Sequence, residues 1–125
     1  MSRRTATSAT PPSQRAAWRN RIVGTGEEAP DQLLANPRNW RLHPRNQQAA
    51  LAGSLDAVGW VHQVMVNRQT GFVVDGHARV ALAISRNEPS VPVLYVDLSP
   101  DEEALVLDAR AEVFERARLQ KDPAA

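Results

Sequence analysis

The stretch that decides the fold is Val73-Val74-Asp75-Gly76-His77-Ala78-Arg79-Val80-Ala81-Leu82-Ala83. The residues Phe72 to Val74 are aromatic or β-branched and follow the turn signal Thr70-Gly71, which predicts a short strand at 72–74. The residues after Arg79 are wholly apolar, which predicts a helix buried on most sides. Gly76 lets the backbone turn tightly between the two and approach a ligand closely.

This turn has the chemistry of a phosphate-binding site. The amides that open a helix have no internal partner and attract anions. Arg79 lies in the first turn and can donate two hydrogen bonds to phosphate oxygens, while His77 adds a donor or a general base. Asp75 is the one acid and could hold a metal or a hydroxyl. The same residues also suit a plain strand-to-helix junction, in which the glycine serves geometry alone and Arg79 is solvated.

Composition sets outer limits on the protein. The 125 residues suit one domain, and a hydrophobic content of 42% suits a globule with a modest core. The absence of cysteine excludes disulfides, thiolate zinc sites and a cysteine nucleophile. No apolar run reaches the length of a membrane span, and no apolar segment follows Arg3 and Arg4, so we expect neither a membrane helix nor a secretory leader.

The charge is unevenly distributed along the chain. Residues 1–21 hold five arginines and no acid, while the rest holds ten basic and fourteen acidic residues, a net charge of −4. A basic arm on a mildly acidic body suggests contact with nucleic acid, although a solvated tail has the same composition. The candidate nucleic-acid contacts are Arg3, Arg4, Arg15, Arg19 and Arg21.

The remaining pattern predicts a single domain between two disordered ends. We expect a disordered basic arm at 1–17, a domain at 18–119 whose first packing residue is Trp18, and a frayed tail at 120–125. The predicted elements are a short strand at 21–23 stopped by Gly24-Thr25-Gly26, a helical turn at 31–34, a helix at 46–58, strands at 64–67 and 91–96, and a last helix from Pro100 to about residue 119. Ser99 and Glu102 form a capping box at the start of that last helix. Pro92 predicts that its strand begins at an edge or at an unpaired end.

The loop at 36–45 is a second candidate binding segment. It combines two prolines and two asparagines with three arginines, a histidine and Trp40. Such a mixture suits binding phosphates or stacking a base. Equally, Trp40 could anchor the loop in the core while the arginines face water.

The ordered set of these motifs resembles a known family. The residues that carry the likeness are Asn36-Pro37 with Arg41, Gly59 with Val64-Met65-Val66, Val73 to Arg79 with Ala83, and Val91-Pro92-Val93 with Asp97-Leu98-Ser99 and Glu102-Glu103-Ala104. Over about residues 20–107 the chain resembles the ParB-like N-terminal domain of the ParB/sulfiredoxin superfamily, in the small form found in phages and mobile elements. The resemblance implies an α+β fold, with a small mixed sheet and a phosphate-binding strand-Gly-helix turn between flanking helices.

The resemblance also implies a nucleotide site. The phosphate-gripping motif of ParB aligns with Gly76-His77-Ala78-Arg79, and Arg41 aligns with the arginine of the family's Asn-Pro motif. The family's loop before the strand, which helps hold the nucleotide, aligns with Gly59 to Gln63 and brings in His62 and Gln63. The implied ligands are a nucleoside triphosphate, CTP or ATP, and Mg²⁺.

The chain also departs from its family. The third ParB motif, Glu-Asn-x-x-Arg, is missing near residues 111–115, and the catalytic cysteine of sulfiredoxin is absent. The Asp-Gly-His-x-Arg sequence instead resembles superfamily members that act on phosphate compounds, including a serine kinase and proposed nucleases.

Three functions follow as alternatives. The first is a nucleotide-binding module that serves DNA partition, DNA modification or phage packaging. The second is a metal-dependent nuclease or phosphotransferase, with Asp75 as metal ligand and His77 as general base. The third is a protein-interaction adaptor with a vestigial pocket.

The resemblance implies DNA as a partner, bound directly or through another protein. A DNA methyltransferase or another phage DNA-processing protein is a second implied partner. The expected location is the cytoplasm of a bacterium or of a phage-infected bacterial host. The sequence leaves open whether the chain forms a homodimer.

Overall fold

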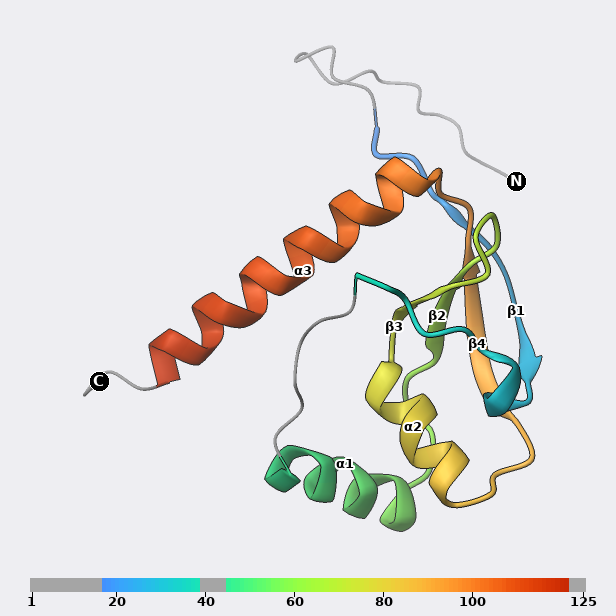
Figure 1. Ribbon diagram of the computed structural model, residues 1–125, viewed down its shortest axis with the longest axis vertical. Coiled ribbons are helices and arrows are strands. Elements are labelled where there is room, and N and C mark those ends of the chain that lie inside the picture. Colours follow the sequence, from blue (N-terminus) through green and yellow to red (C-terminus); the bar gives the residue numbers. More distant parts are fainter. Residues whose placement is uncertain (1–16, 39–44, 122–125) are drawn as a thin grey trace, which may run out of the picture.

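Four strands form one mixed sheet in the computed structural model, which describes residues 17–38 and 45–121 (Figure 1). The strands are β1 (Ile22–Glu28), β2 (Val64–Asn67), β3 (Val73–Asp75) and β4 (Val91–Val96), in the order β1-β4-β2-β3. The central pair β2 and β4 is parallel, whereas β1 pairs with β4 and β3 pairs with β2 in antiparallel fashion. The helices are η2 (Pro30–Gln32, a 3-10 turn), α1 (Arg45–Ala57), α2 (His77–Ser85) and α3 (Pro100–Lys121). This is the expected α+β fold with a small mixed sheet.

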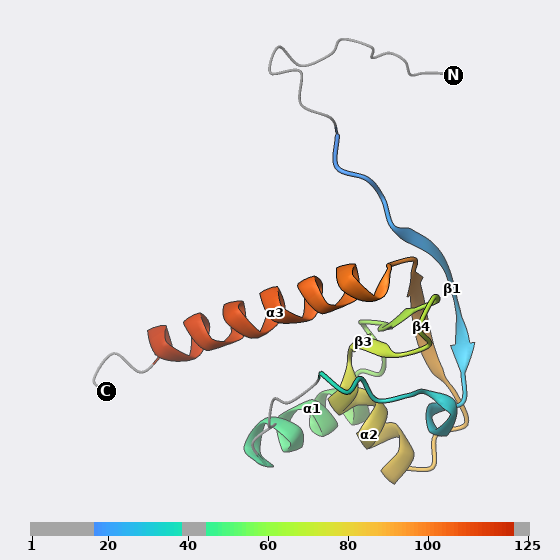
Figure 2. The same ribbon diagram turned by 45° about the horizontal axis from the view of Figure 1, so that its top comes forward.

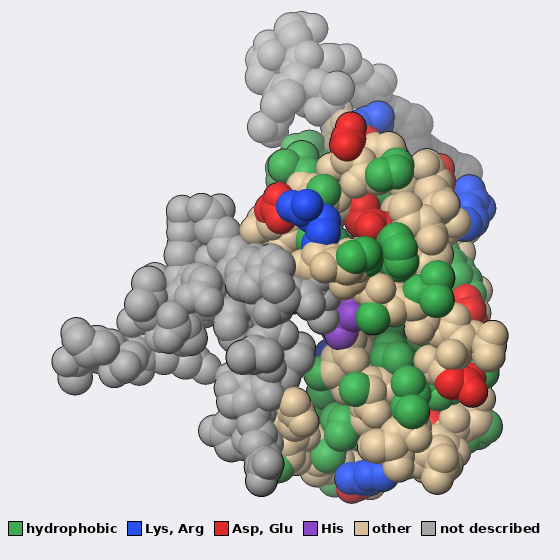
Figure 3. Space-filling model, in the orientation of Figure 1, with side chains coloured by type: hydrophobic (Ala, Val, Ile, Leu, Met, Phe, Trp, Pro, Cys, Tyr) green, Lys and Arg blue, Asp and Glu red, His purple; other side chains and the backbone are tan. Residues whose placement is uncertain are grey.

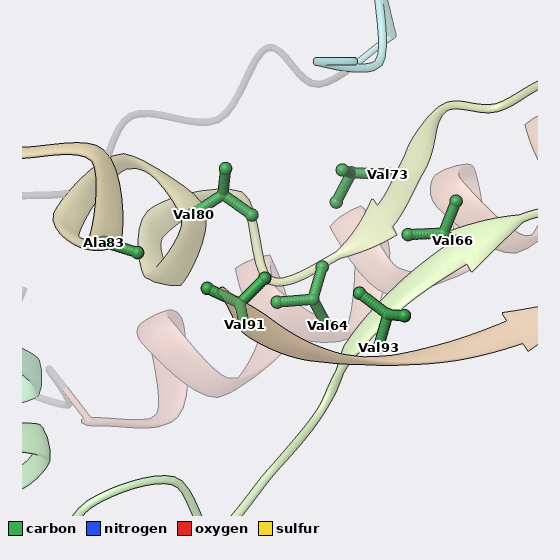
Figure 4. Close-up of a cluster of buried hydrophobic side chains, with 7 residues drawn as sticks. All are labelled: Val64, Val66, Val73, Val80, Ala83, Val91 and Val93. Carbon is green, nitrogen blue, oxygen red and sulfur yellow. The ribbon is translucent and has the colours of Figure 1, made fainter. Parts of the chain in front are cut away.

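Valines fill the core beneath α2. Val64, Val91 and Val93 are fully buried, and Val80 and Ala83 of α2 close over them. Figure 4 shows these side chains converging from β2, β3, β4 and α2. The alternation along each strand sends every second residue to this face. The core therefore fixes where α2 begins relative to the end of β3.

The edge strand β1 is longer than the sequence predicts. Gly24-Thr25-Gly26 was expected to stop a strand, yet β1 runs through both glycines to Glu28. The ring of Tyr95 lies 3.4 Å from the position a Cβ would take on Gly26, and the Tyr95 hydroxyl donates a hydrogen bond to Glu28. That bond is the main cause that raises the pKa of Tyr95 to about 12. Tyr95 thus covers a strand that has no side chains of its own at these positions.

Two further expectations about packing and pairing were wrong or only partly right. The side chain of Trp18 is 89% exposed, so it does not begin the packed core. Pro92 lies on an inner strand rather than at an edge, but pairing with β2 begins one residue later, at Val93. The missing amide of Pro92 therefore interrupts no ladder. The disordered arm, the frayed tail and the domain limits stay predictions, because residues 1–16 and 122–125 lie outside the described part.

The long helix α3 leaves the sheet at a steep angle and points away from it (Figure 2). Its start has the predicted capping box, in which Ser99 Oγ accepts from the Glu102 amide at 3.1 Å and Glu102 Oε1 accepts from the Ser99 amide at 2.9 Å. Among the described residues, no helix is long and apolar enough to cross a membrane.

A buried carboxylate ties α3 to the rest of the fold. Glu103 is 5% exposed and accepts hydrogen bonds from Asn36 Nδ2 at 3.0 Å, Asn67 Nδ2 at 2.8 Å and Thr70 Oγ1 at 2.6 Å. Asn67 in turn exchanges two bonds with the backbone of Leu98, each 3.0 Å long. One helix residue therefore satisfies donors from the loop before α1, the end of β2 and the β2–β3 turn.

Replacing this carboxylate should destabilise the whole domain. Glu103→Ala removes the acceptor of the buried Asn36 amide, of one hydrogen of the buried Asn67 amide and of the half-buried Thr70 hydroxyl. We therefore expect the free energy of unfolding to fall by about 3 kcal/mol or more, measured by urea denaturation. Asp101→Ala, at an exposed position of the same turn, is the control and should change stability by less than about 0.5 kcal/mol. Equal effects of the two substitutions would show that the Glu103 cluster does not hold the fold together.

Candidate functional site

The turn between β3 and α2 has a geometry that only glycine accepts easily. Gly76 has φ of 106° and ψ of 20°, in the left-handed region. A Cβ at this position would lie 3.3 Å from both the Cα and the Cγ2 of Val64. The backbone of the turn is therefore pressed against the centre of the core, which sets the direction in which α2 starts.

The amino end of α2 presents backbone donors without a capping side chain. Gly76 has no side chain to accept from these amides, and the first bond within the helix is donated by the amide of Val80 to the Gly76 carbonyl at 3.0 Å. Arg79 is half-buried in this first turn. Within the described residues its guanidinium makes no ion pair or side-chain hydrogen bond. Side chains of a helix lean toward its amino end, so an arginine in the first turn adds a positive charge near the helix-opening amides, an arrangement that suits an anion.

His77 connects this helix start to the loop before α1. Its Nε2 accepts a hydrogen bond from the backbone amide of Asn36 at 3.2 Å, so the ring proton of the neutral tautomer lies on Nδ1. The Asn36 side chain accepts from the Arg38 amide at 2.9 Å and donates to Glu103. The imidazole thus positions the loop that leads toward Arg41. Its expected roles in catalysis and phosphate binding stay predictions.

Asp75 is held by an arginine from α3. Arg110 Nη2 lies 2.7 Å from Asp75 Oδ1, and the side chains are 34% and 21% exposed. The Arg110 Nε is buried without a hydrogen-bond partner in the described structure. In the described part of the chain, no three His, Cys, Asp or Glu side chains gather as a metal site. Arg110 occupies the Oδ1 atom of Asp75, so a metal at this carboxylate would compete with the arginine there.

His62, Gln63 and Asp75 come together in one open hollow of about 820 Å³. The His62 Nδ1 lies 2.8 Å from the Gln63 carbonyl oxygen, and Gln63 Nε2 donates weakly to the Val93 carbonyl at 3.4 Å. The hollow is also lined by Trp60 and by two further carboxylates, Glu27 and Glu88. The negative charge of these three carboxylates disfavours a phosphate in the hollow. The amides at the start of α2, by contrast, favour a phosphate. Gly76, His77, Ala78 and Arg79 do not line this hollow.

The basic residues are only partly described. Arg3, Arg4, Arg15 and Arg41 lie outside the described residues. Arg19 is exposed, but Arg21 is half-buried and bonded to both carboxylate oxygens of Glu102, at 2.9 and 2.8 Å, and to the Asp97 carbonyl. The Arg21 hydrogen bond is the largest cause that lowers the pKa of Glu102 to about 2. On the face of the molecule that Figure 3 shows, the described arginine side chains are interspersed with Asp and Glu and do not form one continuous basic surface.

The sequence did not point to Glu103, Arg110 or Asp108 as partners of the site. Asp108 accepts two bonds from Arg38, at 2.9 and 3.0 Å, and so holds the same loop as Glu103. All three lie on α3, far along the chain from their partners. The one usable signal was the spacing of Glu103, Leu107 and Arg110, which puts one face of α3 toward the sheet.

The fold and the turn define an α+β domain with a strand-glycine-helix site, and the comparisons place it in a family. The ParB-like nuclease domain-containing protein YnaK of Escherichia coli K12 is 34% identical over 72 residues, which span 58% of this chain and 82% of YnaK. The chain belongs to the ParB-like domain family. No protein-family model matches it.

Two solved structures share the fold. A Pnob8-like ParB-N domain has a TM-score of 0.57 and 15% identity, over 69% of this chain and 34% of that one. The C-terminally truncated chromosome-partitioning protein ParB from Caulobacter crescentus, complexed with CTP-gamma-S, has a TM-score of 0.56 and 22% identity, over 70% of this chain. The chain spans half the length of that ParB and about a third of the Pnob8-like protein.

Adding a side chain at Gly76 should strain the turn. We expect Gly76→Ala to lower the free energy of unfolding by about 1–3 kcal/mol, because of its positive φ and the contact with Val64. Gly53→Ala is the matched control. A Cβ on this exposed glycine of α1 has nothing within 4 Å, and the substitution should stabilise by about 0.5–1 kcal/mol. Thermal unfolding of both variants measures the difference, and a Gly76→Ala protein as stable as wild type would contradict the geometry of the turn.

Proposed function

We propose that the chain is a nucleotide-binding module whose α2 amino end takes the phosphates of a nucleoside triphosphate, CTP or ATP. The observation that carries the proposal is Arg79, half-buried beside the uncapped helix start and without an ion pair in the described part of the chain. A guanidinium can hold phosphate oxygens through two parallel bonds, while the helix amides supply further donors. The related fold of the Caulobacter ParB bound to CTP-gamma-S supports the same ligand class.

The neighbouring loop supports the proposal from a second side. The Asn36 and Arg38 segment is fixed to His77, Glu103 and Asp108, and it leads to Arg41. We propose that Arg41 is a second phosphate contact and that Mg²⁺ enters with the triphosphate. His62 and Gln63 line the same hollow as Asp75 and are proposed to contact the remainder of the nucleotide.

We further propose that the module acts in a DNA-related process such as partition, DNA modification or packaging, in the bacterial cytoplasm. Its support is the ParB-like family and the basic arm, of which the exposed Arg19 is the described representative. Arg21 is a poorer candidate for DNA contact, because Glu102 already neutralises it. A DNA methyltransferase or a phage DNA-processing protein is the proposed type of partner.

A metal-dependent nuclease is the competing function, and the name of YnaK includes a nuclease domain. The two residues on which it depends are both engaged, Asp75 by Arg110 and the His77 Nε2 by the Asn36 amide. Binding requires neither bond to break. For this reason we place binding ahead of metal-dependent cleavage.

Substitution of Arg79 tests the proposed site. Arg79→Lys keeps the charge but loses the paired geometry, and should weaken CTP or ATP binding; Arg79→Ala should weaken it about ten- to a hundred-fold. Isothermal titration calorimetry with Mg²⁺ present measures both. Arg86→Ala is the control, because Arg86 lies at the opposite end of α2 in an exposed ion pair with Asp56.

Unchanged affinity in the folded Arg79→Ala protein would place the nucleotide elsewhere. Absence of binding by the wild-type chain to CTP, ATP and GTP at millimolar concentration would refute the module itself and favour an adaptor with a vestigial pocket.

A further inference from the structure

The free side of β1 is an unpaired sheet edge. The strand order leaves β1 bonded to β4 alone, and no other described strand covers its second side. The segment Ile22–Glu28 contains neither lysine nor proline, and its edge protection is limited to the register shift near Val23 and the two glutamates at its end. Its apolar side chains are also open to solvent, since Ile22 is 51% and Val23 43% exposed. In both ribbon views β1 lies at the outer border of the sheet (Figures 1 and 2).

The hydrogen bonds of β4 show which backbone amides and carbonyls of β1 face the open edge. Asp97 donates its amide to the Arg21 carbonyl on the β1 side, whereas the Val96 carbonyl accepts from Arg68 next to β2. Because backbone groups alternate along a strand, Tyr95 and Val93 also face β1. Their register partners on β1 are Gly24 and Gly26, whose backbone groups therefore face β4. The alternate residues, Thr25 and Glu27, turn their N–H and C=O groups to the open edge.

The charges at the two ends of β1 indicate what pairs with it. The exposed Arg19 precedes the strand, and the exposed Glu27 lies near its end, whereas Arg21 and Glu28 are engaged within the chain by Glu102 and Tyr95. An antiparallel copy of the same strand brings each basic end to an acidic end, whereas a parallel copy opposes like charges. We propose that β1 pairs with β1 of a second copy of this chain in an antiparallel dimer, which joins the two sheets into one.

Thr25 is the natural centre of this pairing. It lies in the middle of Ile22–Glu28 with its backbone donors and acceptors facing outward, and a threonine pair across a two-fold axis is favourable. Gly24 and Gly26 beside it add no bulk against the approaching strand. A register shift at Val23 bends the beginning of β1, which leaves Gly24 to Glu28 as the regular part. The ladder is therefore short, and the dimer should be reversible.

Removing one outward amide tests the dimer. Wild-type protein should pass from monomer to dimer in sedimentation velocity between about 10 µM and 1 mM, the range expected of a small interface. Thr25→Pro costs no bond to β4, yet it places a ring at the centre of the new ladder, and should weaken association at least about ten-fold. Thr25→Val, which keeps the amide and the strand propensity, should still dimerise. A wild-type chain that stays monomeric throughout, or a dimer that survives Thr25→Pro, overturns the proposal.

A cysteine cross-link tests the register without relying on proline. The chain has no cysteine, so Thr25→Cys introduces a single thiol. Directly opposed residues of a hydrogen-bonded antiparallel pair have Cα atoms about 5.5 Å apart, within the range for a disulfide of about 4.4–6.8 Å. Mild oxidation should link Thr25→Cys chains several-fold faster than Asp31→Cys chains, whose thiol is exposed beyond the strand. Equal rates overturn the assigned centre.

Discussion

The structure depends on one buried carboxylate. Glu103 gathers donors from three separate segments, and no neighbouring cation neutralises it within the described residues. A buried acceptor of this kind is tolerated only when its hydrogen bonds are made, so the segments that supply the donors must hold their positions. The cluster also fixes Asn36, whose amide meets His77 at the start of α2. The anchor of α3 and the candidate phosphate site are thus parts of one hydrogen-bonded network.

Around this network α3 makes a series of ion pairs along its length. Glu102 contacts Arg21, Asp108 contacts Arg38 and Arg110 contacts Asp75. The Arg38–Asp108 pair is exposed and contributes little to stability, whereas the other two pairs are partly buried. Together the three pairs fix the direction of a helix that leaves the sheet. Asp75 and Asn36 flank the Gly76 turn from two sides. A ligand at this turn would therefore contact residues whose partners lie on α3.

The sequence predicted most of the elements because their signals are local. The valine runs of β2, β3 and β4, the Ser99 capping box and the glycine turn at Gly76 each depend on neighbours in the chain. The extent of β1 could not be predicted in this way, since Gly26 is covered by Tyr95 from another strand. The same holds for the site. Its glycine and arginine were visible, but the bonds from Asn36 to Glu103 and from Asp75 to Arg110 join residues 67 and 35 positions apart.

In the proposed mode of binding, the amides that open α2 bind the nucleotide phosphates. The most direct measurement is a ¹H–¹⁵N NMR titration of the full chain with CTP and Mg²⁺. We expect the amide signals of Gly76, His77, Ala78 and Arg79 to shift most, and inorganic triphosphate to reproduce these shifts. The proposed site would be contradicted if saturating nucleotide left the Ala78 and Arg79 amide signals unchanged and instead shifted those of His62 and Gln63 in the open hollow.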